Sequence, residues 1–163
     1  NSMGITLGKK FHYDIIRPGI SLYGGHFNTK LKKIIKPVIK LKARVLQIKD
    51  LEKNEFIGYN QTYKTTRLST IAILGIGYAD GISRKLSNKG MVFYRNKKFN
   101  IIGRVSMDSI TIDITKNKKI IKKGTYMELI NHEYDIEKIA KECGTISNEI
   151  LTSISNRVKR NYI

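Results

Sequence analysis

Glycines next to tyrosine, arginine or methionine form four short clusters along the sequence. The clusters read RPGISLYG at 17–24, GYNQTY at 58–63, GIGYADG at 75–81 and GRVSMD at 103–108. A glycine lacks a Cβ atom and lets the backbone approach a ligand closely, while the tyrosine or arginine beside it supplies a polar group. These clusters are therefore the candidate functional residues. The residues alone leave a second interpretation open, in which the glycines form turns beside half-buried tyrosines.

Other familiar catalytic and binding signatures are absent from the sequence. It has no Walker or Rossmann glycine loop and no G-x-S-x-G nucleophile motif. A single cysteine excludes an intrachain disulfide, which agrees with a reducing compartment. The histidines and the cysteine lack metal-ligand spacing, so we predict no metal site at His12, His26, His132 or Cys143.

A strong positive charge is the most unusual feature of the composition. Lysine and arginine total 31 against 13 acidic residues, giving a net charge of +18. Such a charge favours binding to nucleic acid or anionic surfaces. The basic residues are nevertheless spread along the whole chain, without the aromatic–basic string or basic heptads of nucleic-acid binders. With no stretch of ~20 apolar residues and no signal peptide, we expect a cytoplasmic protein that binds neither nucleic acid nor a membrane.

The first 37 residues differ in pattern from the rest of the chain. Residues 11–25 predict a buried strand that ends in a turn near Pro18, and the polar residues 26–37 predict a linker ending at Pro37. The opening Asn1-Ser2 is not typical of a natural start. We therefore expect the sequence to begin inside a longer chain.

From Pro37 onward the pattern is that of β-strands. Apolar and basic residues alternate over 39–45, and the alternation then shifts to Leu46 and Ile48, which predicts a bulge. A continuous apolar run over 69–77 predicts a strand buried on both faces. Further strands are predicted at 91–94 and 99–103, as a hairpin around residues 95–98, and at 110–114 and 126–130.

Two short helices are predicted at the end of the chain. Asp135 can cap a helix that Gly144 ends, because apolar residues between them recur at helical spacing. Ser147 is the predicted cap of the second helix. With 163 residues, of which 40% are apolar, the chain is long enough to bury a core. The predicted fold is a mainly β, barrel-like domain with short terminal helices.

The four clusters, in this order and at these spacings, resemble the C-terminal half of bacterial alanine racemases. Asn1-Ser2 at the start and Ser155-Asn156-Arg157 near the end add to the resemblance. In that family an N-terminal (β/α)₈ barrel binds pyridoxal phosphate through a lysine, and a β domain follows. The resemblance implies that residues 1–25 are the C-terminal end of that barrel, 26–37 a linker, and 38–163 the racemase C-terminal β domain.

The resemblance also implies the reaction. Such enzymes are homodimers that interconvert L- and D-alanine with two bases and supply D-alanine for peptidoglycan. Tyr59 is similar to the tyrosine base, whereas the second base is a lysine outside this sequence, so the chain alone is expected to be inactive. Tyrosine is a poor base at its ordinary pKa of about 10 and needs tuning by its neighbours. Tyr63 is the competing candidate.

Several residues resemble the family's cofactor contacts. Ser2 and the backbone amides of Gly19 and Ile20 are similar to groups that hold the cofactor phosphate. Arg17 is similar to the arginine that faces the pyridine nitrogen and keeps it unprotonated. Asn156 stands where many members have a tyrosine beside the phosphate. Asparagine there is similar to some serine racemases, so serine is an alternative substrate.

The remaining clusters resemble the substrate site. Met107 is similar to the residue whose backbone N–H binds the substrate carboxylate, and Asp80 and Asp108 are expected to hold these turns or their arginines. The alternatives from other classes are a basic module that binds anionic polymers and a related pyridoxal phosphate enzyme such as a decarboxylase, which lacks these clusters. The resemblance places three more residues at the active-site entrance, namely Tyr78, Arg84 and Arg104.

Overall fold

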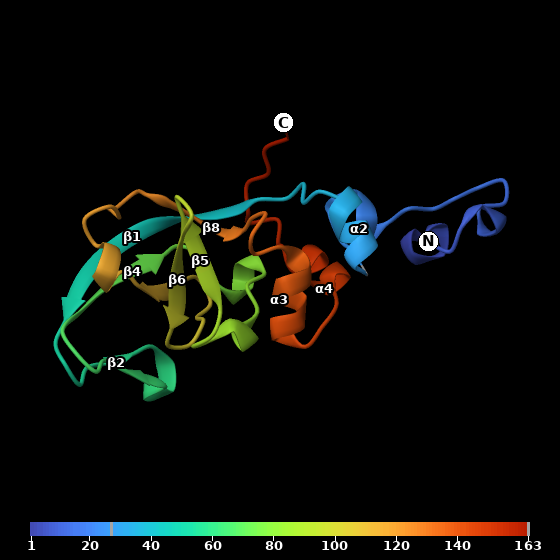
Figure 1. Cartoon of the computed structure of the whole chain (residues 1–163). Helices are drawn as coiled ribbons and strands as arrows, with labels where there is room; N and C mark the ends of the chain where they lie inside the picture. Colours follow the sequence, from blue (N-terminus) through green and yellow to red (C-terminus); the bar gives the residue numbers. More distant parts are fainter. Residues whose placement is uncertain (27, 163) are drawn as a thin grey trace.

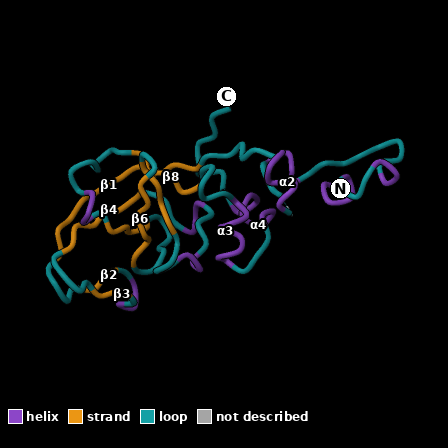
Figure 2. Tube along the Cα trace, in the orientation of Figure 1, coloured by secondary structure: helices purple, strands orange, loops and turns teal. Residues whose placement is uncertain are grey.

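The computed structural model describes residues 1–26 and 28–162 of the chain, so Phe27 in the predicted linker and Ile163 lie outside the described residues. The chain is elongated (Figure 1). A β barrel occupies one end, the helices α3 (Ile136–Cys143) and α4 (Ser147–Ser153) lie beside it, and an N-terminal arm extends away from the opposite side. The tube view shows the same division between strands and helices (Figure 2).

Six antiparallel strands close into the barrel in the order β1-β4-β7-β6-β5-β8. Closure gives each strand two hydrogen-bonded neighbours, so the barrel itself presents no free edge for association with other chains. The expected mainly β, barrel-like fold is confirmed. The strands are β1 (Leu41–Leu51), β4 (Ser69–Leu74), β5 (Met91–Tyr94), β6 (Lys97–Ile102), β7 (Ile110–Asp113) and β8 (Tyr126–Ile130).

Strand β1 follows the alternation seen in the sequence. Leu41, Ala43 and Val45 are buried, while the basic residues between them are exposed. The register of β1 against β4 shifts between Val45 and Gln47, which confirms the predicted bulge. The bulge lets one long strand pair with β8 at its start and with β4 along its second half.

Strand β4 is buried on both faces, as predicted. Ala72 and Leu74 point into the barrel and are fully buried, whereas Ile71 belongs to a second apolar cluster outside the barrel. A small hairpin of β2 (Phe56–Ile57) and β3 (Tyr63–Lys64) contributes Ile57 to this cluster. The hairpin, which the sequence patterns did not predict, therefore covers the outer face of β4.

The hairpin between β5 and β6 is confirmed, but its predicted turn was too long. Only Arg95 and Asn96 form the turn, with φ of 46° and 60°, and Lys97 and Lys98 already pair in β6. Two residues with positive φ give a tight turn whose twist matches that of the strands. Residues 97–98 resembled a loop because both basic side chains are exposed, so the start of β6 shows no alternation of apolar and polar residues.

The helix α3 has the predicted ends. The Asp135 side chain accepts a hydrogen bond from the Lys138 backbone N–H at 2.9 Å, and Gly144 ends the helix in a left-handed conformation. The prediction that Ser147 caps α4 was wrong. Ile146 holds the extended cap conformation, and Ser147 is the first helical residue with its hydroxyl buried and without a partner among the described residues.

The predicted buried strand over 11–25 was also wrong. The arm consists of α1 (Ser2–Ile5), η1 (Lys9–Phe11), an irregular stretch over 12–19 and η2 (Ile20–Tyr23). Ile15 is 80% exposed. A strand needs a hydrogen-bonded neighbour, and none of the described strands pairs with this stretch. The predicted linker is partly helical as well, because it contains α2 (Thr29–Ile34), capped by the Asn28 side chain.

The helices of the described chain are short, and the longest, α3, has 8 residues. None of the helices in the described ranges has the length and apolar character needed to cross a bilayer.

The burial pattern predicts that Leu74 contributes more than Leu68 to the free energy of unfolding. Leu74→Ala should lower the free energy of unfolding by about 2–5 kcal/mol, because it leaves a cavity in the core. Leu68→Ala, at a residue that is 61% exposed, should change it by less than about 0.5 kcal/mol. Urea denaturation followed by circular dichroism measures both, and equal effects of the two substitutions would contradict the proposed core.

Candidate functional site

Two of the glycine clusters are joined by backbone hydrogen bonds at one end of the barrel. The Tyr78 N–H donates to the Ser106 carbonyl at 2.9 Å, and the Ala79 N–H donates to the Met107 carbonyl at 3.0 Å. The turn over 75–81 follows β4, and the loop over 103–109 connects β6 with β7. Two segments that are distant in sequence therefore form one surface.

The cluster over 58–63 joins this surface through two glycines. A Cβ atom built on Gly58 would lie 3.1 Å from the Arg104 nitrogen, and one built on Gly103 would lie 2.9 Å from the Ile57 carbonyl oxygen. Both glycines also have positive φ, of 73° and 74°. At these two glycines the close approach is therefore between one backbone and another, not between the backbone and a ligand.

The two candidate tyrosines of this cluster have different environments. Tyr59 begins the short turn η3 (Tyr59–Gln61) and is 69% exposed, and its hydroxyl bonds to no other described residue. Tyr63 is half-buried and packs against the second apolar cluster. The turn after Tyr59 is strained, because Asn60 and Gln61 both have positive φ without being glycine. Tyr59 is therefore the more exposed of the two tyrosines.

The residues predicted for substrate binding and for the entrance lie at this end. Met107 is 52% exposed, and its backbone N–H has no partner in the described part of the chain. Tyr78 is also exposed, and the Arg84 guanidinium lies 6.0 Å from the centre of its ring. Arg104 is half-buried, with a buried Nε atom that lacks a partner within the described ranges. The surface thus presents two cations and one available amide.

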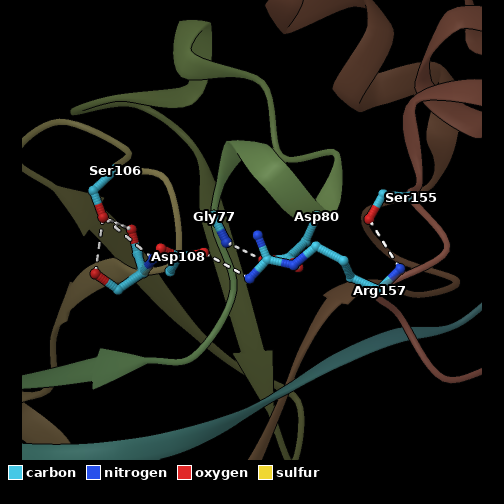
Figure 3. Close-up of polar contacts among 7 residues, drawn as sticks. Gly77, Asp80, Ser106, Asp108, Ser155 and Arg157 are labelled. Carbon is cyan, nitrogen blue, oxygen red and sulfur yellow. Dashed lines mark hydrogen bonds and ion pairs between the residues drawn. The ribbon is translucent and has the colours of Figure 1, made fainter.

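Two carboxylates fasten these turns to the end of the chain (Figure 3). Asp80 is buried and accepts a hydrogen bond from the Gly77 N–H at 2.8 Å. Arg157 lies 3.3 Å from Asp80 and donates to Asp108 at 2.6 Å. The pKa of the Arg157 guanidinium is raised above its ordinary value by the hydrogen bond to Asp108 and by the charge of Asp80.

The expectation that Asp80 and Asp108 hold the turns or their arginines is confirmed in part. Asp80 does hold its own turn, but the arginine that the two carboxylates share is Arg157, not Arg84 or Arg104. Arg157 was not among the residues predicted for the site. Its partners are distant in sequence, so no local motif connects them.

A second group of polar atoms lies in the N-terminal arm. The buried Ser2 hydroxyl accepts hydrogen bonds from the Gly19 N–H at 2.8 Å and from the Ser21 N–H at 3.4 Å. The Ile20 N–H lies between these two amides and has no partner among the residues described, and the buried Ser21 hydroxyl likewise lacks one there. Convergent amides and hydroxyls of this kind suit a phosphate group.

The structure does not bring Arg17 and Asn156 onto this cradle. Arg17 is exposed in the irregular part of the arm and contacts no other described side chain through a hydrogen bond or ion pair. Asn156 is exposed and accepts a hydrogen bond from Arg160 at 3.1 Å. The C-terminal segment does reach the cradle farther along, because Val158 and Tyr162 line a groove that also contains Gly19 and Ile20.

The β2–β3 hairpin and the N-terminal arm lie at opposite ends of the molecule (Figure 1). The hairpin that carries Tyr59 follows the far end of the barrel, whereas the N-terminal arm with Ser2 extends from the other side (Figure 1). A single chain in this conformation cannot place the Tyr59 hydroxyl at the Ser2 cradle.

Within the described ranges, no three His, Cys, Asp or Glu side chains gather closely enough to hold a metal ion.

The fold is that of a known class of protein. It matches the crystal structure of the alanine racemase of Bartonella henselae, which holds covalently bound pyridoxal phosphate, with a TM-score of 0.91 and 42% identity. The match covers 99% of this chain and 45% of that one. The barrel with its short helices is therefore the β-rich domain of alanine racemases.

Sequence comparison gives the family. The model of the alanine racemase C-terminal domain matches residues 38–162. The alanine racemases of Brucella ovis and Rickettsia canadensis are each 44% identical to this chain, over 100% and 99% of it respectively. The chain belongs to the alanine racemase family. It spans less than half of these relatives, covering 45% and 44% of their lengths.

The contact between the two turns predicts that a side chain at Gly77 would destabilise the fold. A Cβ atom at Gly77 would lie 2.3 Å from the carbonyl oxygens of Ser106 and Met107, which are backbone atoms that cannot move aside cheaply. Gly77→Ala should therefore lower the free energy of unfolding by about 1–3 kcal/mol. At Gly75 a Cβ atom would meet only the flexible end of Leu46. Gly75→Ala is the matched control and should cost less, and urea denaturation compares the two variants.

Proposed function

We propose that this chain is part of a pyridoxal phosphate-dependent alanine racemase that interconverts L- and D-alanine in the cytoplasm and supplies D-alanine for peptidoglycan. Family membership supports the reaction, and the bound pyridoxal phosphate in the Bartonella henselae enzyme supports the cofactor. One observation carries the site assignment. The exposed Tyr59 lies in the β2–β3 hairpin, which approaches the loop that carries Met107 at Gly58 and Gly103, and this hairpin is far from the N-terminal arm that contains Ser2 (Figure 1).

The N-terminal arm would hold the phosphate of the cofactor. The Ser2 hydroxyl and the backbone amides of Gly19 and Ile20 converge there. The Ser2 hydroxyl still has its own hydrogen to donate, and the Ile20 N–H has no partner among the described residues. The Gly19 N–H would exchange its bond to Ser2 for one to the phosphate. Arg17 would face the pyridine nitrogen, where a permanently cationic donor keeps that nitrogen unprotonated. When bound, pyridoxal phosphate withdraws electrons from the substrate and makes its Cα proton easier to remove.

Tyr59 would serve as one of two bases. Racemisation removes the Cα proton on one face of the amino acid and returns a proton to the opposite face, so each face needs its own group. The Tyr59 hydroxyl is exposed and free to reach one face, while a lysine outside this sequence serves the other. This chain alone, which has only one of the two bases, is expected to be inactive.

The separation of the two groups supports a homodimer. Because Tyr59 and the Ser2 cradle lie at opposite ends of one chain, a complete site needs Tyr59 from one protomer and the cradle from its partner. The Met107 amide would then bind the substrate carboxylate beside Tyr59. Tyr78, Arg84 and Arg104 would line the entrance, where the two cations attract an anionic carboxylate.

The substrate assignment depends on Asn156. Its side chain is exposed and paired with Arg160, so it does not fill space beside the cradle. A smaller polar residue at this place is what makes serine the alternative substrate. Alanine is the proposed substrate because the relatives of this chain are alanine racemases.

The proposed base is tested in the full-length enzyme. Tyr59→Phe should lower kcat for alanine racemisation by about 10²–10⁴-fold, because it removes the hydroxyl that exchanges the proton. Tyr63→Phe is the matched control and should change kcat by less than about threefold, because Tyr63 acts through the packing of its ring. Polarimetry or a coupled D-alanine assay measures both.

Each result has a distinct meaning. A large loss with Tyr63→Phe and not with Tyr59→Phe would reverse the assignment of the base. A clear preference of the wild-type enzyme for serine would keep the mechanism and change the substrate. No turnover of either amino acid by a folded enzyme with bound cofactor would refute the proposed function.

The phosphate cradle is tested by cofactor binding. Ser2→Ala should raise the dissociation constant for pyridoxal phosphate by about ten- to a hundredfold, since it removes a hydrogen bond to a charged group. Thr6→Ala is the control, because the Thr6 hydroxyl donates to the nearby Met3 carbonyl at 2.7 Å and forms no bond with the cradle. Absorbance titration of the apoenzyme measures both constants. Equal affinities of wild type and Ser2→Ala would remove Ser2 from the site.

A further inference from the structure

Arg157 connects three segments that are far apart in sequence (Figure 3). Its Nε atom lies 3.3 Å from Asp80 in the turn after β4, and its Nη2 atom donates to Asp108 in the loop after β6 at 2.6 Å. Arg157 itself follows α4, where its backbone N–H donates to the Ser155 hydroxyl at 3.2 Å. One side chain thus links both turns of the proposed substrate surface to the end of the chain.

We propose that Arg157 is a positioning residue for the substrate carboxylate, and that it acts by fixing the loop that carries Met107. The inference rests on the proposed function, in which the Met107 backbone N–H binds that carboxylate. It adds a residue that contacts neither substrate nor cofactor but determines where that amide points.

The loop that carries Met107 is held from two sides. On one side the Ala79 N–H donates to the Met107 carbonyl at 3.0 Å, and on the other Arg157 holds the side chain of the next residue, Asp108. The peptide groups around Met107 therefore have little freedom to rotate. The Met107 N–H is left without a partner among the described residues, so it stays available in a fixed direction.

Asp80 supplies the fixed point to which Arg157 is attached. It is only 8% exposed, its carboxylate accepts from the Gly77 N–H at 2.8 Å, and its backbone carbonyl accepts from the Ser155 N–H at 3.2 Å. Arg157 therefore holds the exposed Asp108 in a fixed position relative to Asp80, which is buried and forms several hydrogen bonds. A planar guanidinium suits this role, because it can donate hydrogen bonds to two carboxylates in a defined geometry.

Arg157 does not serve as the carboxylate-binding group itself. Its Nε and Nη2 atoms are already engaged by Asp80 and Asp108, so most of its positive charge is matched before a substrate arrives. General stabilisation is not its main role either. The side chains of Arg157 and Asp108 are 53% and 59% exposed, and ion pairs this exposed contribute little to the free energy of unfolding.

The first test separates binding from turnover in the full-length enzyme. Arg157→Met should raise KM for alanine by about tenfold and change kcat by less than about threefold, because the amide loses its fixed direction while the bases remain. Arg157→Lys keeps one charge and should restore part of the lost KM. Arg67→Met is the matched control, since Arg67 forms a comparably exposed ion pair with Asp113 at 4.0 Å.

The second test does not depend on activity. Hydrogen–deuterium exchange of the Arg157→Met enzyme should be at least about threefold faster over residues 105–109 than in wild type, and unchanged in the barrel strands β4 and β7. The Arg67→Met variant should leave the loop at the wild-type rate. Faster exchange throughout the barrel would indicate a general structural role and would overturn the proposal.

The outcomes also separate this inference from the proposed function. Wild-type racemisation with an unchanged KM and an unchanged loop in Arg157→Met would refute the positioning role and leave the racemase assignment intact. A wild-type enzyme that turns over no amino acid would refute the proposed function, and the role toward a carboxylate would fall with it. Hydrogen–deuterium exchange of the loop would then still show whether Arg157 fixes residues 105–109.

Discussion

Closure of the six-stranded barrel is the constraint on which the rest of the structure depends. Because β4 and β6 both pair antiparallel with β7, which lies between them, both strands end on the same side of the barrel. The turns that follow β4 and β6 therefore emerge close together. The contact at Gly77 then brings these turns so close that their backbones bond directly. The positions of Met107 and of the arginines proposed for the entrance are consequences of this arrangement.

Local signals predicted the elements that depend on local chemistry. The alternation and bulge of β1, the doubly buried β4 and both ends of α3 were correct because periodicity and capping residues act within a few positions. The strand predicted over 11–25 failed for the opposite reason, since a strand exists only with a neighbour elsewhere in the chain. The β2–β3 hairpin was missed because strands of two residues are too short to show a period.

The residues of the candidate site likewise fall into those that local signals predicted and those that depend on distant parts of the chain. The glycine clusters were recognisable, because close backbone contacts exclude side chains at defined positions such as Gly58 and Gly77. The association of Asp80 and Asp108 with their turns was expected from position. Arg157 was not, because it and Asp108 are 49 residues apart and only the folded chain brings them together. Tyr59 and Tyr63 also differ in exposure, which the letters GYNQTY do not contain.

The separation of Tyr59 from the Ser2 cradle has a genetic consequence. If each complete site combines halves from two chains, a chain defective at Tyr59 and a chain defective at Ser2 are damaged in different halves. A mixed dimer of the two would contain one site with both defects and one site with neither. Two mutant alleles, each inactive alone, would then complement one another when expressed in the same cell. Conversely, a chain defective at both positions would impair every normal subunit with which it pairs.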